Sequence, residues 1–316
     1  MEKPKTISEQ MAEFTLGLTY KDIPKDVIDH GKLLLTDTFG VAMACQDLEH
    51  AKAVKKTVLE MNSQKVCSLW GTDEKAMLAD AILYNSCLIH GMDYDDTHVG
   101  SIIHPSTAFT VGEMVGATGK QMLEAIVAGW EIIVRLGLAA KGRFHDVGYH
   151  GTGIASPFAA ACVAAKLMGD TKETLVNALG ICGSQSAAIQ EFLHDGTWTK
   201  KIHPGWAAHS AIYALSLARN GYTGPAKVFE GGFGMWMTHC GGFRGRICGP
   251  WNKVAYAGDH CKAISSLSYD PFHHRLYDQS HGRKWIFSRG YRSCRVPYRQ
   301  QVLRHCMQSK RSKGKT

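Results

Sequence analysis

Apolar positions recur at spacings of three and four through most of the first 220 residues, which is the period of amphipathic helices. No strand-like alternation of any length precedes about residue 225. The pattern therefore predicts an all-α main domain. With starts such as Thr6 and breaks at Gly, Asp and Asn clusters, it places helices over 6–19, 25–44, 76–90, 107–117, 121–140, 155–168, 171–190 and 204–220.

Composition narrows the class of protein. The chain of 316 residues is 45% hydrophobic, enough to bury a core in one large domain or two ordinary ones. Its start lacks the apolar core of a signal peptide, and we expect no apolar run long enough to cross a bilayer. The ten cysteines include no Cys-x-x-Cys pair, which indicates free thiols in a reducing compartment. We therefore expect a cytoplasmic protein with no membrane partner. The thiols expected to be buried are Cys45, Cys67, Cys87, Cys162 and Cys182.

The formal charge of +8 is concentrated at the C-terminal end. Residues 283–316 hold eleven of the 36 Lys and Arg residues and no Asp or Glu, so the remainder is mildly acidic. Residues 279–316 have neither a helical stripe nor a strand pattern, which predicts a disordered basic tail. No nucleic-acid-binding module is recognisable, and we expect no specific nucleic acid partner.

The segment 90–106 concentrates three imidazoles and three carboxylates between two apolar runs. Charged groups held against packed apolar elements are where pKa values shift and protons move. A simple loop with a helix cap is one alternative, because Asp and Thr side chains cap helix starts well. A hard metal site is another, but the spacing matches no recognised ligand signature, so we predict no metal. Its ligands would be His90, Asp93, Asp95, Asp96, His98 and His104.

Several sequence blocks, in order, resemble the MmgE/PrpD family, which includes 2-methylcitrate dehydratase, cis-aconitate decarboxylase and iminodisuccinate epimerase. The resemblance covers roughly residues 5–235 and fades beyond. The blocks are Leu35-Thr-Asp-Thr-Phe-Gly40, Leu69-Trp-Gly71, His90-Gly-Met-Asp-Tyr-Asp-Asp-Thr97, His104-Pro-Ser106, Gly148-Tyr-His-Gly-Thr-Gly153 and Thr199-Lys-Lys-Ile-His-Pro-Gly205.

The resemblance implies a large all-helical domain with a smaller α/β domain over the active site, usually in a homodimer. It implies small di- or tricarboxylate substrates and no cofactor. This chain is shorter than typical members, so most of the second domain is expected to be absent. On this basis we predict a helical N-terminal domain over 1–235, a remnant of the α/β lid domain over 236–278, and the basic tail over 279–316.

The resemblance also assigns site residues. Asp93, Thr97, His104, His150 and Lys200 would form the catalytic wall, and His203 would stand beside them as a substrate-binding residue together with Lys200. A compressed segment, 269–278, resembles a family motif and makes His274 the equivalent of a family histidine. Between Thr97 and His104 the chain has one residue more than the decarboxylase pattern, which leaves the substrate open.

Residue chemistry agrees with an acid/base lyase. Lys200 would supply fixed positive charge for a polycarboxylate. His104 and His150 are the expected proton-transfer pair, with Asp93 orienting one ring. Dehydration and decarboxylation need the same groups, so both stay open. Isolated histidines are more often structural, as expected of His30, His145 and His209. The alternatives are a catalytically impaired, truncated family member or a metal-dependent hydrolase built on the segment from His90 to His104.

Overall fold

The computed structural model describes residues 4–61, 63–95, 103–243, 245, 247, 251 and 254. All of them belong to one compact unit, Met1–Tyr269. Thr97, His98 and His274 lie outside the described residues, as do the tail and most of the predicted lid remnant. The proposed domain boundaries at 235 and 278 therefore remain predictions.

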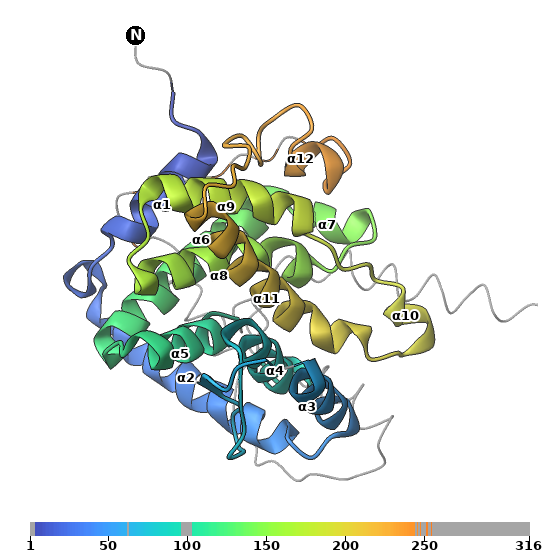
Figure 1. Cartoon of the computed structure of the whole chain (residues 1–316). Coiled ribbons are helices and arrows are strands. Elements are labelled where there is room, and N and C mark those ends of the chain that lie inside the picture. Colours follow the sequence, from blue (N-terminus) through green and yellow to red (C-terminus); the bar gives the residue numbers. More distant parts are fainter. Residues whose placement is uncertain are drawn as a thin grey trace, which may run out of the picture. The chain divides into compact units, whose positions relative to one another are not determined.

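Helices make up nearly all the regular structure of the described residues (Figure 1), which confirms the all-α main domain. The remaining regular elements are one short 3-10 turn, η1 (Tyr20–Asp22), and one small hairpin of β1 (Cys67–Ser68) and β2 (Lys75–Ala76). The helices are α1 (Ile7–Gly17), α2 (Lys25–Cys45), α3 (Glu49–Met61), α4 (Leu78–His90), α5 (Ile103–Val115), α6 (Gly119–Ala140), α7 (Arg143–Asp146), α8 (Gly151–Met168), α9 (Lys172–Gln185), α10 (Phe192–Asp195), α11 (Thr199–Arg219) and α12 (Met235–Thr238).

The structure corrects several sequence-based boundaries. Helix α3 was not predicted, because it buries only three residues and its apolar stripe is thin. Helix α11 begins five residues earlier than expected and contains Pro204 as its sixth residue, so this proline does not mark the helix start. Helix α9 stops at Gln185 instead of residue 190, and the chain then crosses the start of α8 as an extended loop. The β1–β2 hairpin was also missed.

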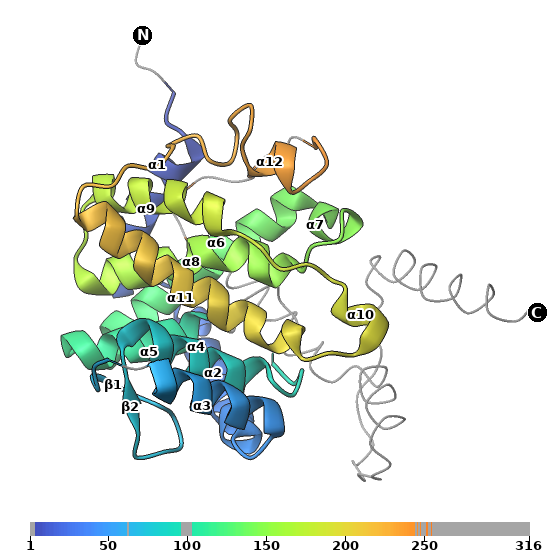
Figure 2. The ribbon, with the colours of Figure 1, turned by 45° about the vertical axis from the view of Figure 1, so that its right-hand side comes forward.

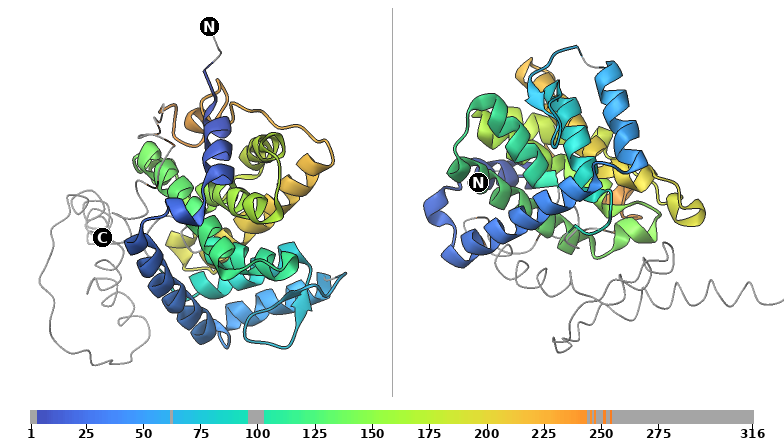
Figure 3. Two further views of the ribbon diagram at one scale, coloured as in Figure 1. Left: turned by 90° about the vertical axis from the view of Figure 1, so that its left-hand side faces the viewer. Right: turned by 90° about the horizontal axis from the view of Figure 1, so that it is seen from below.

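Helix α8 forms the centre of the bundle. It packs against α5, α6, α9 and α11, and α11 in turn packs along α4 (Figures 1 and 2). The small residues of α8 and α11 permit these close approaches: a Cβ on Gly205 would lie 2.5 Å from the Leu83 carbonyl oxygen of α4. Helix α2 lies on the outside of the bundle (Figure 3), and only part of its surface is buried.

Helix α8 also overturns the expectation that no apolar run is long enough to cross a bilayer. By length and composition it passes that test, but 83% of its apolar window is buried inside the bundle. Its apolar character is that of a core helix surrounded on all sides by other helices.

The predicted free thiols are confirmed for all five cysteines named from the sequence, and Cys240 is a sixth buried free thiol among the described residues. Burial raises the pKa of Cys45 to about 11 and that of Cys162 to about 12. These groups therefore act as small apolar core side chains at neutral pH.

Candidate active site

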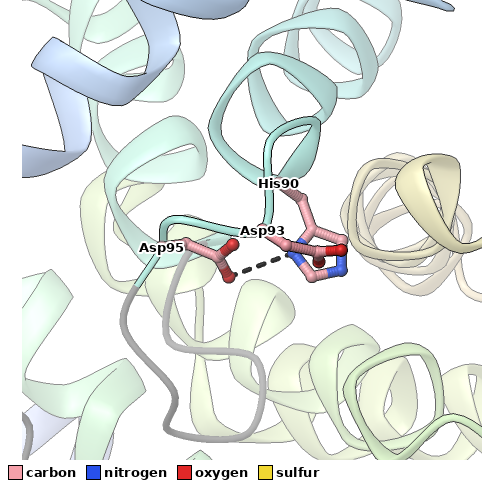
Figure 4. A group of neighbouring side chains, drawn as sticks. All are labelled: His90, Asp93 and Asp95. Atoms are coloured by element: carbon pink, nitrogen blue, oxygen red, sulfur yellow. Dashed lines mark hydrogen bonds and ion pairs between the residues drawn. The ribbon is translucent and has the colours of Figure 1, made fainter. Parts of the chain in front are cut away.

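A tight turn after α4 gathers the charged residues of the first motif. Helix α4 ends at His90, and Gly91 follows against Cys45 and His50, where a side chain would collide with the thiol and the imidazole. Asp93 adopts a left-handed backbone conformation with φ of 56°, which is uncommon for a residue with a side chain. This turn brings His90, Asp93 and Asp95 close together, as Figure 4 shows.

His90 is held by a carboxylate and a second imidazole. Its Nδ1 lies 3.0 Å from Oδ2 of Asp95, and the two side chains are only 7% and 10% exposed. The ring of His90 stacks on that of His150, with centroids 5.7 Å apart and an interplanar angle of 18°. The end of α4 is thereby joined to the start of α8.

The start of α8 is shaped by the loop that follows α9. The backbone N–H of His150 donates to the carbonyl of Ala188 at 2.8 Å, and Ala188 has a φ of 123°, a strained value. Gly153 leaves room for this loop, because a side chain there would collide with Ala188. The imidazole of His150 then meets that of His203 on α11, with 3.1 Å between the two Nδ1 atoms.

Two lysines in the first turn of α11 tie this helix to the turn after α4. Lys200 Nζ donates to Oδ1 of Asp93 at 2.5 Å, and Lys201 Nζ donates to the carbonyl of Gly91. The side chain of Lys200 is 31% exposed and that of Asp93 is 45% exposed. The ion pair therefore borders the more enclosed imidazoles instead of being buried with them.

Burial, and then the positive charge of the cluster, lowers the pKa values of two imidazoles and keeps them neutral. Burial, followed by His90, Lys200 and other neighbouring imidazoles, lowers the pKa of His150 to about 2. Burial, then His90 and Lys200, lowers the pKa of His203 to about 4. Burial alone would raise the pKa of Asp93, but the charge and hydrogen bond of Lys200 outweigh it and lower that pKa. Neutral imidazoles beside a fixed cation can accept a proton when an anion arrives.

The structure brings together four of the predicted site residues: Asp93, His150, Lys200 and His203. His104 is fully buried on α5, and its ring lies against Gly129 of α6. His104 thus lies in the core between α5 and α6. The convergence of His104 with the other four residues stays a prediction. Thr97 and His274 lie outside the described residues.

Three residues of the cluster were not among the catalytic or substrate-binding residues predicted from the sequence. His90 and Asp95 form the enclosed pair, in which the Asp95 carboxylate contacts Nδ1 of His90, whereas the expected orientation of His104 or His150 by Asp93 stays a prediction. His145, expected to be structural, lies with its ring centroid 6.5 Å from that of His150 and adds to the lowering of the pKa of His150. His90 and Asp95 stand on either side of Asp93 in the motif, which is the signal that could have found them.

The same turn has the composition of a cation site, since ligand atoms of His90, Asp93 and Asp95 lie within 4.8 Å of one another (Figure 4). However, Asp95 accepts from His90 Nδ1, and Asp93 accepts from Lys200. The Lys200 ammonium thus already neutralises the carboxylate that a metal would need. The absence of a metal remains a prediction.

One cavity is lined in part by the cluster, and a second opens beside the turn after α4. One, of about 450 Å³, is lined by His203, Gly153, Phe192 and Trp206 among others. The other, of about 520 Å³, opens beside Met92 and Tyr94 and includes Asp37. Burial, and then the charge of Asp95, raises the pKa of Asp37. Volumes of this size suit a small organic acid.

Comparison with known proteins identifies the family of this chain. The model of the MmgE/PrpD N-terminal domain matches residues 9–246. The chain belongs to the MmgE/PrpD family. A cis-aconitate decarboxylase-like protein of Aspergillus oryzae is 24% identical, over 73% of this chain and 51% of its own length. The cis-aconitate decarboxylase of Aspergillus terreus is 24% identical (72% and 49%), and that of Homo sapiens is 28% identical (74% and 51%). The chain thus spans about half the length of these relatives.

Proposed function

We propose that this MmgE/PrpD chain carries the helical wall of a cofactor-independent lyase that acts by acid/base catalysis on a small di- or tricarboxylate. The observation that carries the proposal is the Lys200–Asp93 ion pair beside the stacked rings of His90 and His150 and the adjoining ring of His203. Family membership and the cis-aconitate decarboxylases among its relatives support the same class of reaction.

The proposed chemistry follows from charge. A polycarboxylate brings negative charge to a cluster that holds Lys200 and several neutral imidazoles. Carboxylates of the bound acid would pair with the Lys200 ammonium and stabilise the imidazolium form of His150, because an opposite charge nearby favours the charged state. His150 could then hold a proton removed next to a carboxylate, or return one to a carbanion left after loss of CO₂.

Dehydration and decarboxylation differ in the bond that breaks and not in the proton-transfer groups required. The residue types of the cluster serve both, so we place the reaction at the level of a lyase. We also propose a homodimer, as the family resemblance implies. We propose a cytoplasmic location, in keeping with the free buried thiols. A second domain over the site, as the family resemblance implies, would exclude water from the reaction.

The test is turnover by the full chain. Purified protein would be incubated with cis-aconitate, 2-methylcitrate and iminodisuccinate, and products would be followed by NMR and by CO₂ release. We expect conversion of at least one acid, and loss of conversion in Lys200→Met. Binding of an acid without any conversion would instead support the impaired family member, and the absence of both binding and conversion would contradict the proposal.

A metal-dependent hydrolase is the second candidate, favoured by the proximity of His90, Asp93 and Asp95. Under our proposal, treatment with a chelator leaves turnover unchanged. Loss of activity with a chelator, restored by a divalent cation, would favour the hydrolase. The Asp93→Asn variant would then lose metal as well as activity.

A further inference from the structure

The His90–Asp95 pair is the most enclosed acid-base pair of the cluster. Its side chains are 7% and 10% exposed, against 31% and 45% for Lys200 and Asp93. His90 is the last residue of α4 and Asp95 lies in the turn that follows, so the pair forms between residues five positions apart in the sequence (Figure 4).

The hydrogen bond decides which nitrogen of His90 carries a proton. An ionised carboxylate can only accept, so Nδ1 of His90 must donate to Oδ2 of Asp95 across the 3.0 Å between them. Nε2 is then the atom that can gain or lose a proton. It is buried and has no hydrogen-bond partner among the described residues. Buried polar atoms without partners are rare and call for an explanation, and a role in catalysis is one of them.

Asp93, the other carboxylate of the turn, is paired elsewhere and does not hold the His90 ring. Oδ1 of Asp93 accepts from Lys200, which holds this carboxylate toward α11. The partner of His90 on its ring face is His150, whose Nδ1 is occupied by His203. Each of the three imidazoles therefore has one nitrogen paired with a neighbour, and the hydrogen-bond partner of His90 is Asp95.

Resting on the function proposed above, we propose that Asp95 is a positioning residue that holds the ring and tautomer of His90, and that His90 Nε2 is a further proton-transfer atom of the site. In the step, Nε2 takes a proton from the bound acid, Nδ1 keeps its own proton, and the imidazolium is stabilised by the Asp95 carboxylate, which is not itself protonated. The proton returns from Nε2 to product or solvent.

The experiment uses Asp95→Asn, His90→Gln and the double variant in the full chain. Asp80→Asn is the matched control, because Asp80 also binds a histidine, His209, at 3.3 Å between α4 and α11 but outside the cluster. Two readouts apply: kcat and KM on the acid that the wild type converts, and ¹⁵N NMR of histidine-labelled protein, in which the His90 signals are assigned by their loss in His90→Gln.

We expect Asp95→Asn to lower kcat about 10- to 100-fold with little change in KM, since one charge-assisted hydrogen bond is lost. In the His90→Gln background the same substitution should cause no further loss, because Asp95 acts through His90. Asp80→Asn should leave kcat unchanged. An additive loss in the double variant, or wild-type kcat in Asp95→Asn, would overturn the proposal.

NMR separates this proposal from the proposed function. The wild type should show His90 protonated at Nδ1, with that resonance shifted in Asp95→Asn and unchanged in Asp80→Asn. A His90 protonated at Nε2, or a resonance insensitive to Asp95, overturns the positioning role even in an active enzyme. A wild type that converts none of the acids contradicts the proposed function, and the NMR result then decides the His90–Asp95 assignment by itself.

Discussion

Two histidine–aspartate pairs lie at opposite ends of α4, which packs along α11, and their surroundings differ. At one end of the contact, His90 and Asp95 are 3.0 Å apart, and His90 stacks on the imidazole of His150. At the other, His209 and Asp80 are 3.3 Å apart, and His209 stacks on the indole of Trp206 with centroids 5.0 Å apart and an interplanar angle of 6°.

The two pairs differ in what surrounds them more than in their own geometry. Burial, and then nearby cationic groups, lower the pKa of His150, which lies beside His90. The pKa of His209 is lowered by burial, but Asp80 opposes that effect, and its neighbours Trp206 and Tyr213 are about half exposed aromatic side chains. A histidine–aspartate pair is therefore only a candidate for catalysis, and the charges around it decide its role.

Replacing His150 should separate the two regions most strongly. His150→Gln removes the imidazole that links His90 to His203, and we expect turnover to fall about 10²- to 10⁴-fold, as for loss of a general acid or base. His209→Gln should leave turnover unchanged. Steady-state kinetics on the converted acid measures both, and equal effects of the two substitutions would remove the distinction between the regions.

The second difference between the two regions is a fixed cation. Lys200 pairs with Asp93 beside His90, whereas no lysine or arginine pairs with Asp80 among the described ion pairs. Lys200→Met should lower kcat/KM about 10²- to 10³-fold, the usual effect of removing one electrostatic stabiliser. The matched control is Lys172→Met, which breaks a surface ion pair with Glu13. Similar losses in both variants would point to a general effect of charge on the fold.

Acid should destabilise the protein mainly through the enclosed imidazoles. The pKa of His150 is lowered to about 2 and that of His203 to about 4, so the native state binds fewer protons than the unfolded state below about pH 6.5. Stability is therefore present above that pH and is lost as pH falls, by up to ~1.4 kcal/mol per pH unit for each group.

Urea denaturation at pH 7, 6 and 5 tests this linkage. His150→Gln should flatten the dependence of the unfolding free energy on pH. His209→Gln should flatten it less, because Asp80 counteracts the effect of burial on His209. A wild-type slope in His150→Gln would mean that His150 has the same pKa in the native and unfolded states.

The helices were predictable because their buried faces repeat with the helical period, as in α6, which was expected at 121–140 and found at Gly119–Ala140. Helix α3 was not, since it buries only His50, Ala51 and Val58, too few to mark a stripe. The hairpin of β1 and β2 was missed because two residues per strand show no alternation.

The site was predictable as a set of residues but not as a set of partners. Sequence motifs identified Asp93, His150 and Lys200, which the structure brings into one cluster. They could not show that Asp95 and not Asp93 meets His90. The left-handed backbone of Asp93, with φ of 56°, lies between the two partners, and the order of side chains does not reveal it.

The smallest expected effect concerns the stability contributed by the second pair. Asp80→Asn keeps the size of the side chain and its ability to hydrogen bond with His209, and both partners are partly exposed, at 17% and 16%. Loss of one such charge should cost about 0.2–1 kcal/mol of unfolding free energy at neutral pH, as for ion pairs near the surface. The stacking of His209 on Trp206 and its contact with Tyr213 are untouched by this substitution and should preserve the local packing. Urea denaturation of Asp80→Asn measures the difference directly. A cost of several kcal/mol would show that this pair, too, depends on an enclosed charge, and the contrast between the two ends of the α4–α11 contact would then be lost.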